Sequence, residues 1–358
     1  MRLFTLLAPG VPVMRAARRT LAPWDNLTCS GPLPHDPYAG SRSPADICSD
    51  SGSLYDEARG LGLTYSLHRP ARPDGLLPVV IYSAPMNWGG RFPATPSAYY
   101  IAEHLARAGY LAVNIRSTDS DRFVLPQDIA TVPDPRTYIR DAIRDPERPR
   151  NRFLDMGFLL DKMLGWNSTG ALAGHIDGER IGICGHSFGA RTAMALIGER
   201  IGPARLSYRD ARLKAAMVYS LGPSVAPGNL APVYGDVRVP VCFMGGSRDF
   251  SWDTPAPPAD RVRPYYWTNA PVQYKIVLKG ADHLTFPGGR AETGVANRRE
   301  LRNLQFIRSI SLAFWDAHLR GDAGALDWLR SGLGDALRGN GRGEFRLGSE
   351  AESSKRLS

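Results

Sequence analysis

The chain has 358 residues, of which 43% are hydrophobic and 22% are charged, a composition that excludes a disordered or collagen-like chain. No stretch approaches the roughly 20 uninterrupted apolar residues of a membrane helix, so we expect no transmembrane segment. The formal net charge is +9, but arginines alternate with acids, as in RTYIRDAIRDPERPRNR at 136–152, which indicates a solvated basic surface and no nucleic-acid partner.

Residues 1–54 are rich in Pro, Gly, Ser and Asp and are expected to form a leader with little regular structure. The apolar run in MRLFTLLAPGVPVM is interrupted by prolines and a glycine, and the arginines follow it, which is not typical of a signal peptide. A cytoplasmic location is therefore favoured over a periplasmic or secreted one, although both stay open. Cys29 and Cys48 could form a disulfide only in an exported protein.

From residue 55 to about 335, short β-branched runs alternate with helical stretches, which is typical of βαβ units in one domain. Several runs are apolar throughout, as expected for strands that are buried on both faces. The predicted strands are 63–68, 78–83, 110–115, 180–184, 215–221, 239–244 and 272–278, and the predicted helices are 98–108, 152–164, 190–197 and 298–319. The sequence therefore predicts an α/β fold with a mostly parallel central sheet and helices on both faces.

The loop SAPMNWGG follows the second predicted strand directly. A loop in this place supplies one of the two N–H groups that bind the oxyanion in hydrolases with a serine at a strand-to-helix turn. By position Met86 supplies that N–H, because Pro85 has none to donate. The alternative is a Gly-rich turn without a catalytic role. Trp88 in this loop is a candidate for the substrate pocket.

Two further segments depart from the alternating pattern. Residues 124–150 contain many prolines and charges and are predicted to be an insertion near the mouth of a site. From residue 336 to the end at 358 the chain is polar, and we expect a disordered tail.

The stretch RIGICGHSFGARTAMAL at 180–196 matches the pattern G-x-S-x-G between a predicted strand and a predicted helix. A nucleophilic serine needs a tight turn of this kind, and the flanking glycines keep its neighbours small. Ser187 is therefore a candidate nucleophile, and the N–H of Phe188 is a candidate oxyanion donor at the helix N-terminus. The alternative is an ordinary strand-to-helix turn.

A serine needs a base and an orienting carboxylate to act as a nucleophile at neutral pH. Asp249 follows the predicted strand 239–244, and His283 follows the strand 272–278, in the order acid then histidine that such hydrolases require. Catalytic groups collect at the carboxyl ends of parallel strands, which favours both residues. Asp253 is the second candidate for the acid. Asp282 and Asp236 are expected to be turn or surface residues.

Two other residues are weaker candidates for the substrate pocket. His186 flanks Ser187, and its alternative roles are a packed residue of the turn or, less favoured, the base. Trp252 lies in the loop after Asp249. The sequence contains no CxxC pair and no His/Cys cluster, so no metal site is predicted.

From Ser53 to Leu329 the chain resembles the α/β-hydrolase superfamily, and more closely the bacterial dienelactone-hydrolase-like proteins related to platelet-activating-factor acetylhydrolase. The resemblance depends on SLYDEARG and PVVIYS, on NRFLDMGFLLDKML before HIDGERIGICGHSFGARTAMAL, on GSRD and ADHLTF, and on FWDAHLRGDAGALDWL. Two positions depart from the family pattern. Relatives usually have a His-Gly pair where this chain has Ala84-Pro85, and true dienelactone hydrolases have a cysteine at the position of Ser187.

The resemblance implies a Ser-His-Asp esterase or lipase that acts on small-molecule or lipid acyl esters without a cofactor. It places Ser187, Asp249 and His283 at the catalytic positions and Met86 and Phe188 in the oxyanion hole. A serine peptidase or amidase, or a non-catalytic binding protein on the same fold, stays open as an alternative. The acyl chain length and the oligomeric state are not predicted.

Overall fold

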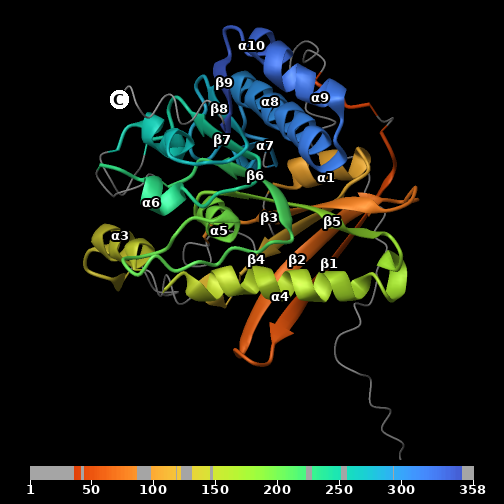
Figure 1. Cartoon of the computed structure of the whole chain (residues 1–358), viewed down its shortest axis with the longest axis horizontal. Coiled ribbons are helices and arrows are strands. Elements are labelled where there is room, and N and C mark those ends of the chain that lie inside the picture. The colour runs from red at the N-terminus through yellow and green to blue at the C-terminus, as the bar shows by residue number, and fades with distance from the viewer. Residues whose placement is uncertain are drawn as a thin grey trace, which may run out of the picture.

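The computed structural model of the chain describes residues 36–41, 44–86, 98–117, 119–121, 131–145, 148–222, 228–250, 256–292 and 294–348. Within these residues, one continuous sheet runs through the molecule in the order β1-β2-β4-β3-β5-β6-β7-β8-β9, with helices on both sides (Figure 1). The strands from β4 to β8 in this order pair in parallel, and β1, β2 and β9 pair antiparallel with their neighbours. The predicted α/β class and the mostly parallel sheet are thereby confirmed.

Every predicted strand overlaps an observed one. The strands are β1 (Ile47–Asp56), β2 (Leu61–Pro70), β3 (Leu77–Ser83), β4 (Leu111–Arg116), β5 (Ile176–His186), β6 (Leu213–Tyr219), β7 (Val241–Gly246), β8 (Val272–Leu278) and β9 (Gly341–Leu347). The apolar runs form the middle of the sheet, where β3 and β4 are buried along their whole length. Strands that are buried on both faces are apolar throughout, which explains why the sequence predicted them.

The two edge strands, β1 and β9, were not predicted. β1 begins inside the expected leader and pairs with β2 from Ile47 to Asp56, and β9 lies in the expected disordered tail and pairs with β8. The expectation of little regular structure is thus wrong for residues 47–54 and 341–347. Both segments are polar and partly exposed, and backbone hydrogen bonds to a neighbouring strand satisfy them without an apolar pattern of their own.

The predicted helices are present with small differences at their ends. The α-helices are α1 (Tyr99–Arg107), α3 (Pro135–Arg144), α4 (Arg150–Trp166), α5 (Phe188–Ile197), α6 (Ala231–Tyr234), α7 (Gly289–Glu292), α8 (Arg298–Trp315), α9 (Ala323–Asp327) and α10 (Leu333–Ala336). The predicted helix 298–319 is α8 followed by a π-helical turn, Asp316–Arg320. Within the predicted insertion, the structure describes residues 131–145 and 148–150, which include α3.

The two faces of the sheet have separate cores. Side chains at alternate positions of β3 divide between them: Val79 and Ile81 pack with residues of α4 and α5, and Val80 and Tyr82 pack with residues of α1 and α8. In Figure 1, α4 crosses one side of the sheet and α8 lies with α1 on the other. Because helices cover both faces of the sheet, the carboxyl ends of the parallel strands lie together along one edge, where loops follow them.

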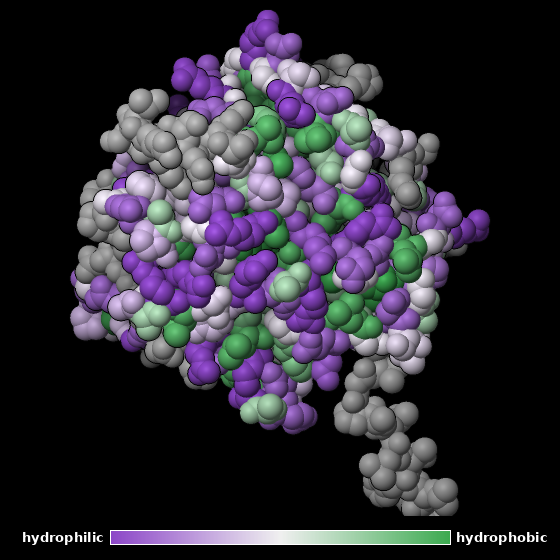
Figure 2. Space-filling model, in the orientation of Figure 1, coloured by the Kyte–Doolittle hydropathy of each residue, from purple (hydrophilic) through white to green (hydrophobic). Residues whose placement is uncertain are grey.

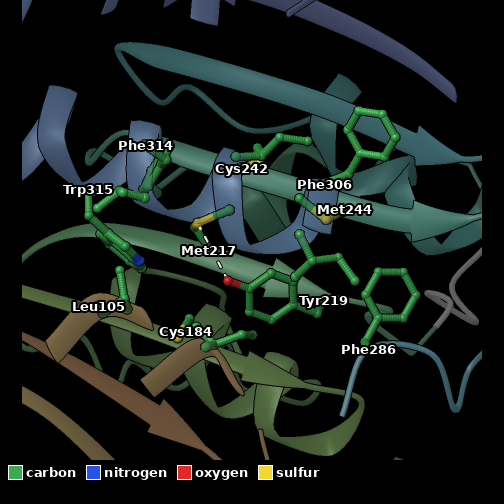
Figure 3. Packing of buried hydrophobic residues seen from close by; sticks show 14 of the residues in the cluster. Leu105, Cys184, Met217, Tyr219, Cys242, Met244, Phe286, Phe306, Phe314 and Trp315 are labelled. Carbon is green, nitrogen blue, oxygen red and sulfur yellow. Dashed lines mark hydrogen bonds between the residues drawn. The ribbon is translucent and has the colours of Figure 1, made fainter. Parts of the chain in front are cut away.

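Figure 3 shows the core beneath α8, where Met217 and Tyr219 of β6 lie between Cys184 and Cys242, and the Tyr219 hydroxyl donates to Met217 Sδ at 3.6 Å. Burial raises the pKa of both thiols. The two cysteines therefore stay protonated and pack as small apolar side chains.

On the face of the molecule seen in Figure 2, hydrophilic and hydrophobic side chains are interspersed. Several arginines pair with acids: Arg212 contacts Asp161 at 2.5 Å and Asp210 at 2.6 Å, and Arg180 contacts Asp177 at 2.6 Å.

In the part of the chain that the structure describes, no helix has the length and apolar character needed to cross a bilayer.

His318 gives the fold a predicted sensitivity to acid. Burial lowers its pKa from 6.5 to about 4, and its Nε2 lies 3.0 Å from the Tyr274 hydroxyl. The pKa of His318 is lower in the folded protein than in the unfolded chain, so the folded state favours the neutral imidazole. The stabilisation from this neutral imidazole is complete above pH 6.5, and as pH falls toward 4 the free energy of unfolding decreases by about 1.4 kcal/mol per pH unit. We expect the melting temperature of the His318→Gln variant to fall less steeply between pH 7 and pH 5 than that of the wild type. Parallel curves would contradict this assignment.

Candidate active site

Ser187 is the single residue between β5, which ends at His186, and α5, which begins at Phe188. Its backbone has φ 58° and ψ −116°, a combination that costs a non-glycine residue on the order of 1–3 kcal/mol. Surrounding structure must hold such a residue in place. The strain is typical of a serine presented on a sharp turn above a sheet.

The two glycines of the motif are required by close backbone contacts. A Cβ on Gly185 would lie 2.3 Å from the carbonyl oxygen of Gly189, and a Cβ on Gly189 would lie 2.0 Å from the carbonyl oxygen of Ser83. Neither position has room for a side chain. The first turn of α5 is therefore packed directly against the end of β3.

The structure brings Ser187, His283 and Asp249 together. His283 Nε2 lies 2.9 Å from Ser187 Oγ, and His283 Nδ1 lies 3.2 Å from Asp249 Oδ1. The three residues follow β5, β8 and β7, so they meet at one edge of the sheet although 96 positions separate Ser187 from His283. An imidazole that carries its proton on Nδ1 donates to the carboxylate and accepts the serine proton on Nε2.

Asp249 is completely buried and has a cationic partner, Arg261. Arg261 Nε lies 2.7 Å from Asp249 Oδ1 and donates to the Asp249 carbonyl oxygen at 2.7 Å. A buried carboxylate without a partner would be strongly destabilising, so the ion pair with Arg261 stabilises the Asp249 side chain in this position. The sequence did not reveal Arg261, because it lies in a Pro-rich 3₁₀ segment, Pro258–Tyr266, with no periodic pattern.

Ser220 also faces the imidazole. Its Oγ lies 2.6 Å from His283 Nδ1, so this nitrogen has two polar neighbours, Ser220 and Asp249. Ser220 follows β6 and has φ 50°. The strand-end rule that identified Asp249 and His283 would have found this residue too, had it been applied to β6.

His186 packs against the ring of His283. The residue is 2% exposed, and its ring is tilted by 46° against the His283 ring at a centroid distance of 4.6 Å and stacks on Phe286 at 6.2 Å. Burial and then the nearby His283 hold the pKa of His186 well below 6.5. His186 is therefore neutral and packs behind the His283 ring.

The structure describes both predicted oxyanion donors. Phe188 begins α5, and the first N–H groups of a helix have no acceptor within that helix. Met86 is buried and lies three residues after the end of β3 at Ser83, following Ala84 and Pro85. Trp88, Trp252 and the second acid candidate, Asp253, lie outside the described residues.

The other two carboxylates have different surroundings. Asp282 pairs with Arg290 at 2.6 Å and accepts from the backbone N–H groups of Leu284 and Thr285. Asp236 precedes β7, at the opposite edge of the sheet, and pairs with Arg200 at 2.5 Å.

Comparison of the chain with models of known protein families and with curated protein sequences gives no match. Among the described residues, no group of three or more His, Cys, Asp or Glu side chains is placed to hold a metal ion.

Proposed function

We propose that this protein is a serine hydrolase of the α/β-hydrolase fold that cleaves carboxylic esters through an acyl-enzyme. The observation that carries the proposal is the 2.9 Å contact between Ser187 Oγ and His283 Nε2 at a strained strand-to-helix turn. The sheet order, with β2 antiparallel in an otherwise parallel centre, is compatible with that fold.

In the proposed mechanism, Ser187 Oγ attacks the ester carbonyl while its proton passes to His283 Nε2. The carbonyl oxygen becomes an oxyanion, which the N–H groups of Phe188 and Met86 stabilise. The bond to the alcohol oxygen then breaks, and His283 returns the proton to the leaving alcohol.

Water completes the proposed cycle. His283 removes a proton from water as it attacks the acyl-enzyme, the acid is released, and the proton returns to Ser187 Oγ. Asp249 and Ser220 hold the imidazole with its proton on Nδ1, and Asp249 stabilises the imidazolium. Apart from the ester and water, every group in the proposed cycle is a side chain or a backbone group of this chain.

The test is to treat the protein with a fluorophosphonate probe and to assay p-nitrophenyl esters from acetyl to palmitoyl. Trypsin releases the peptide IGICGHSFGAR, in which Ser187 is the only hydroxyl side chain. We expect the label on this peptide and turnover of at least one ester. Labelling without ester turnover would favour an amidase, and the absence of both would favour a non-catalytic binding protein.

A further inference from the structure

Arg152 is a buried arginine next to the candidate active site. It lies in the first turn of α4 and its side chain has no solvent exposure. An arginine is rarely fully buried unless its charge and its donors are paired. Its partners come from three other segments of the chain, and two of these segments carry the proposed oxyanion donors.

One set of contacts holds the loop after β3. Arg152 Nη2 donates to the carbonyl oxygen of Ala84 and to Ser83 Oγ, the latter at 3.4 Å. The N–H of Ala84 donates to the carbonyl oxygen of Ile115 at 3.0 Å. Both peptide groups of Ala84 are thus anchored.

Pro85 transmits this anchoring to Met86. A proline ring restricts φ to about −65°, so ψ of Pro85 is the one soft torsion left between the anchored Ala84 carbonyl and the N–H of Met86. The Ala84-Pro85 pair, which departs from the His-Gly of the resembling family, is in this view a stiff connection. Arg152 fixes its starting point.

The second set of contacts holds the start of α5. Arg152 Nε donates to Thr192 Oγ1 at 3.2 Å, and the Thr192 hydroxyl donates to the carbonyl oxygen of Phe188 at 3.1 Å. The guanidinium also lies over the Phe188 ring, 5.3 Å from its centroid. Nη1 pairs with Asp121, which balances the buried charge.

From this geometry we propose that Arg152 is a positioning residue that holds the two oxyanion donors, Met86 and Phe188, in the relative placement that catalysis requires. The inference depends on the proposed function. The two N–H donors must lie within hydrogen-bond distance of the position that the oxyanion takes in the transition state, which differs from that of the carbonyl oxygen in the bound ester. A misplacement of a donor by about 1 Å can therefore reduce the rate roughly 10²-fold.

The experiment compares kcat, KM and inhibition by a trifluoromethyl ketone in the wild type and in Arg152→Met. The ketone forms a hemiketal with Ser187 whose oxyanion binds where the transition-state oxyanion binds. We expect kcat to fall roughly 10²-fold, KM to change less than about threefold, and the ketone to lose affinity by a factor similar to the loss in kcat. Arg152→Lys, which keeps the charge opposite Asp121 but has fewer donors, should be intermediate.

Thr192→Val keeps the proposal testable if Arg152→Met does not fold. It removes the hydroxyl between Arg152 and Phe188 and leaves no charge unpaired. We expect kcat and ketone affinity to fall roughly fivefold together, a smaller effect than the loss of a whole donor. In the Arg152→Met background, the same substitution should have little further effect.

Arg59→Met is the matched control. Arg59 also anchors α4, through Asp155 at 2.9 Å and the carbonyl oxygen of Asn151 at 2.9 Å, but has no described contact with the loop after β3. We expect a lower melting temperature with kcat and ketone affinity close to those of the wild type. If Arg152→Met lowers only the melting temperature, as this control does, Arg152 is structural and the proposal is wrong. A wild type without ester turnover or labelling would instead overturn the proposed function itself.

Discussion

Replacement of Ser187 by alanine is expected to reduce ester hydrolysis by roughly 10⁴- to 10⁶-fold, because the remaining groups cannot form an acyl-enzyme. Fluorophosphonate labelling should disappear completely. KM cannot be interpreted for such a variant, so the measurement is the initial rate at saturating ester together with intact-protein mass after labelling.

Ser309→Ala is a suitable control for this variant. Ser309 is fully buried in α8, and its Oγ has no hydrogen-bond partner among the described residues. We expect its rate and labelling to equal those of the wild type. Equal rates and labelling in the wild type and Ser187→Ala would show that the nucleophile lies elsewhere.

Asp249→Asn is expected to have the second large effect, a loss of about 10⁴-fold in kcat. Asparagine presents either an amide N–H or a neutral oxygen to His283 Nδ1, so the imidazole loses the partner that selects its tautomer and stabilises its charged form. The variant also leaves Arg261 without its carboxylate, and loss of one member of a buried pair costs about 3–5 kcal/mol. Activity must therefore be measured well below the melting temperature of the variant.

Two further substitutions make this result specific. Asp282→Asn changes the carboxylate next to His283, which pairs with Arg290 and caps a turn, and should change kcat less than about tenfold. The double variant Asp249→Asn with Arg261→Gln should recover stability but not activity, because it removes the unpaired charge without restoring the carboxylate. Full activity in Asp249→Asn together with its loss in Asp253→Asn would assign the acid to Asp253.

The strands and the positions of the candidate triad could be predicted from local patterns. Buried strands are apolar over their whole length, and the residues just after β5, β7 and β8 lie at a common edge whatever the details of packing. The positions of Ser187, Asp249 and His283 just after three such strands, together with their order along the chain, were therefore enough to predict that the three residues lie close together. Their catalytic roles stay predictions until the variants are assayed.

The edge strands and the groups around the triad were decided by the tertiary structure. β1 and β9 are polar and exist because a neighbouring strand satisfies their backbone. Arg261 pairs with Asp249, which is only 12 positions away, but Arg261 lies in the 3₁₀ segment Pro258–Tyr266 and Asp249 lies in the loop after β7. Arg152 contacts Ser83 and Ala84, which are 69 and 68 positions away. Periodicity and motif spacing report which face a side chain occupies and where a strand ends, whereas a buried charge is specified by partners that only the folded chain brings within hydrogen-bond distance.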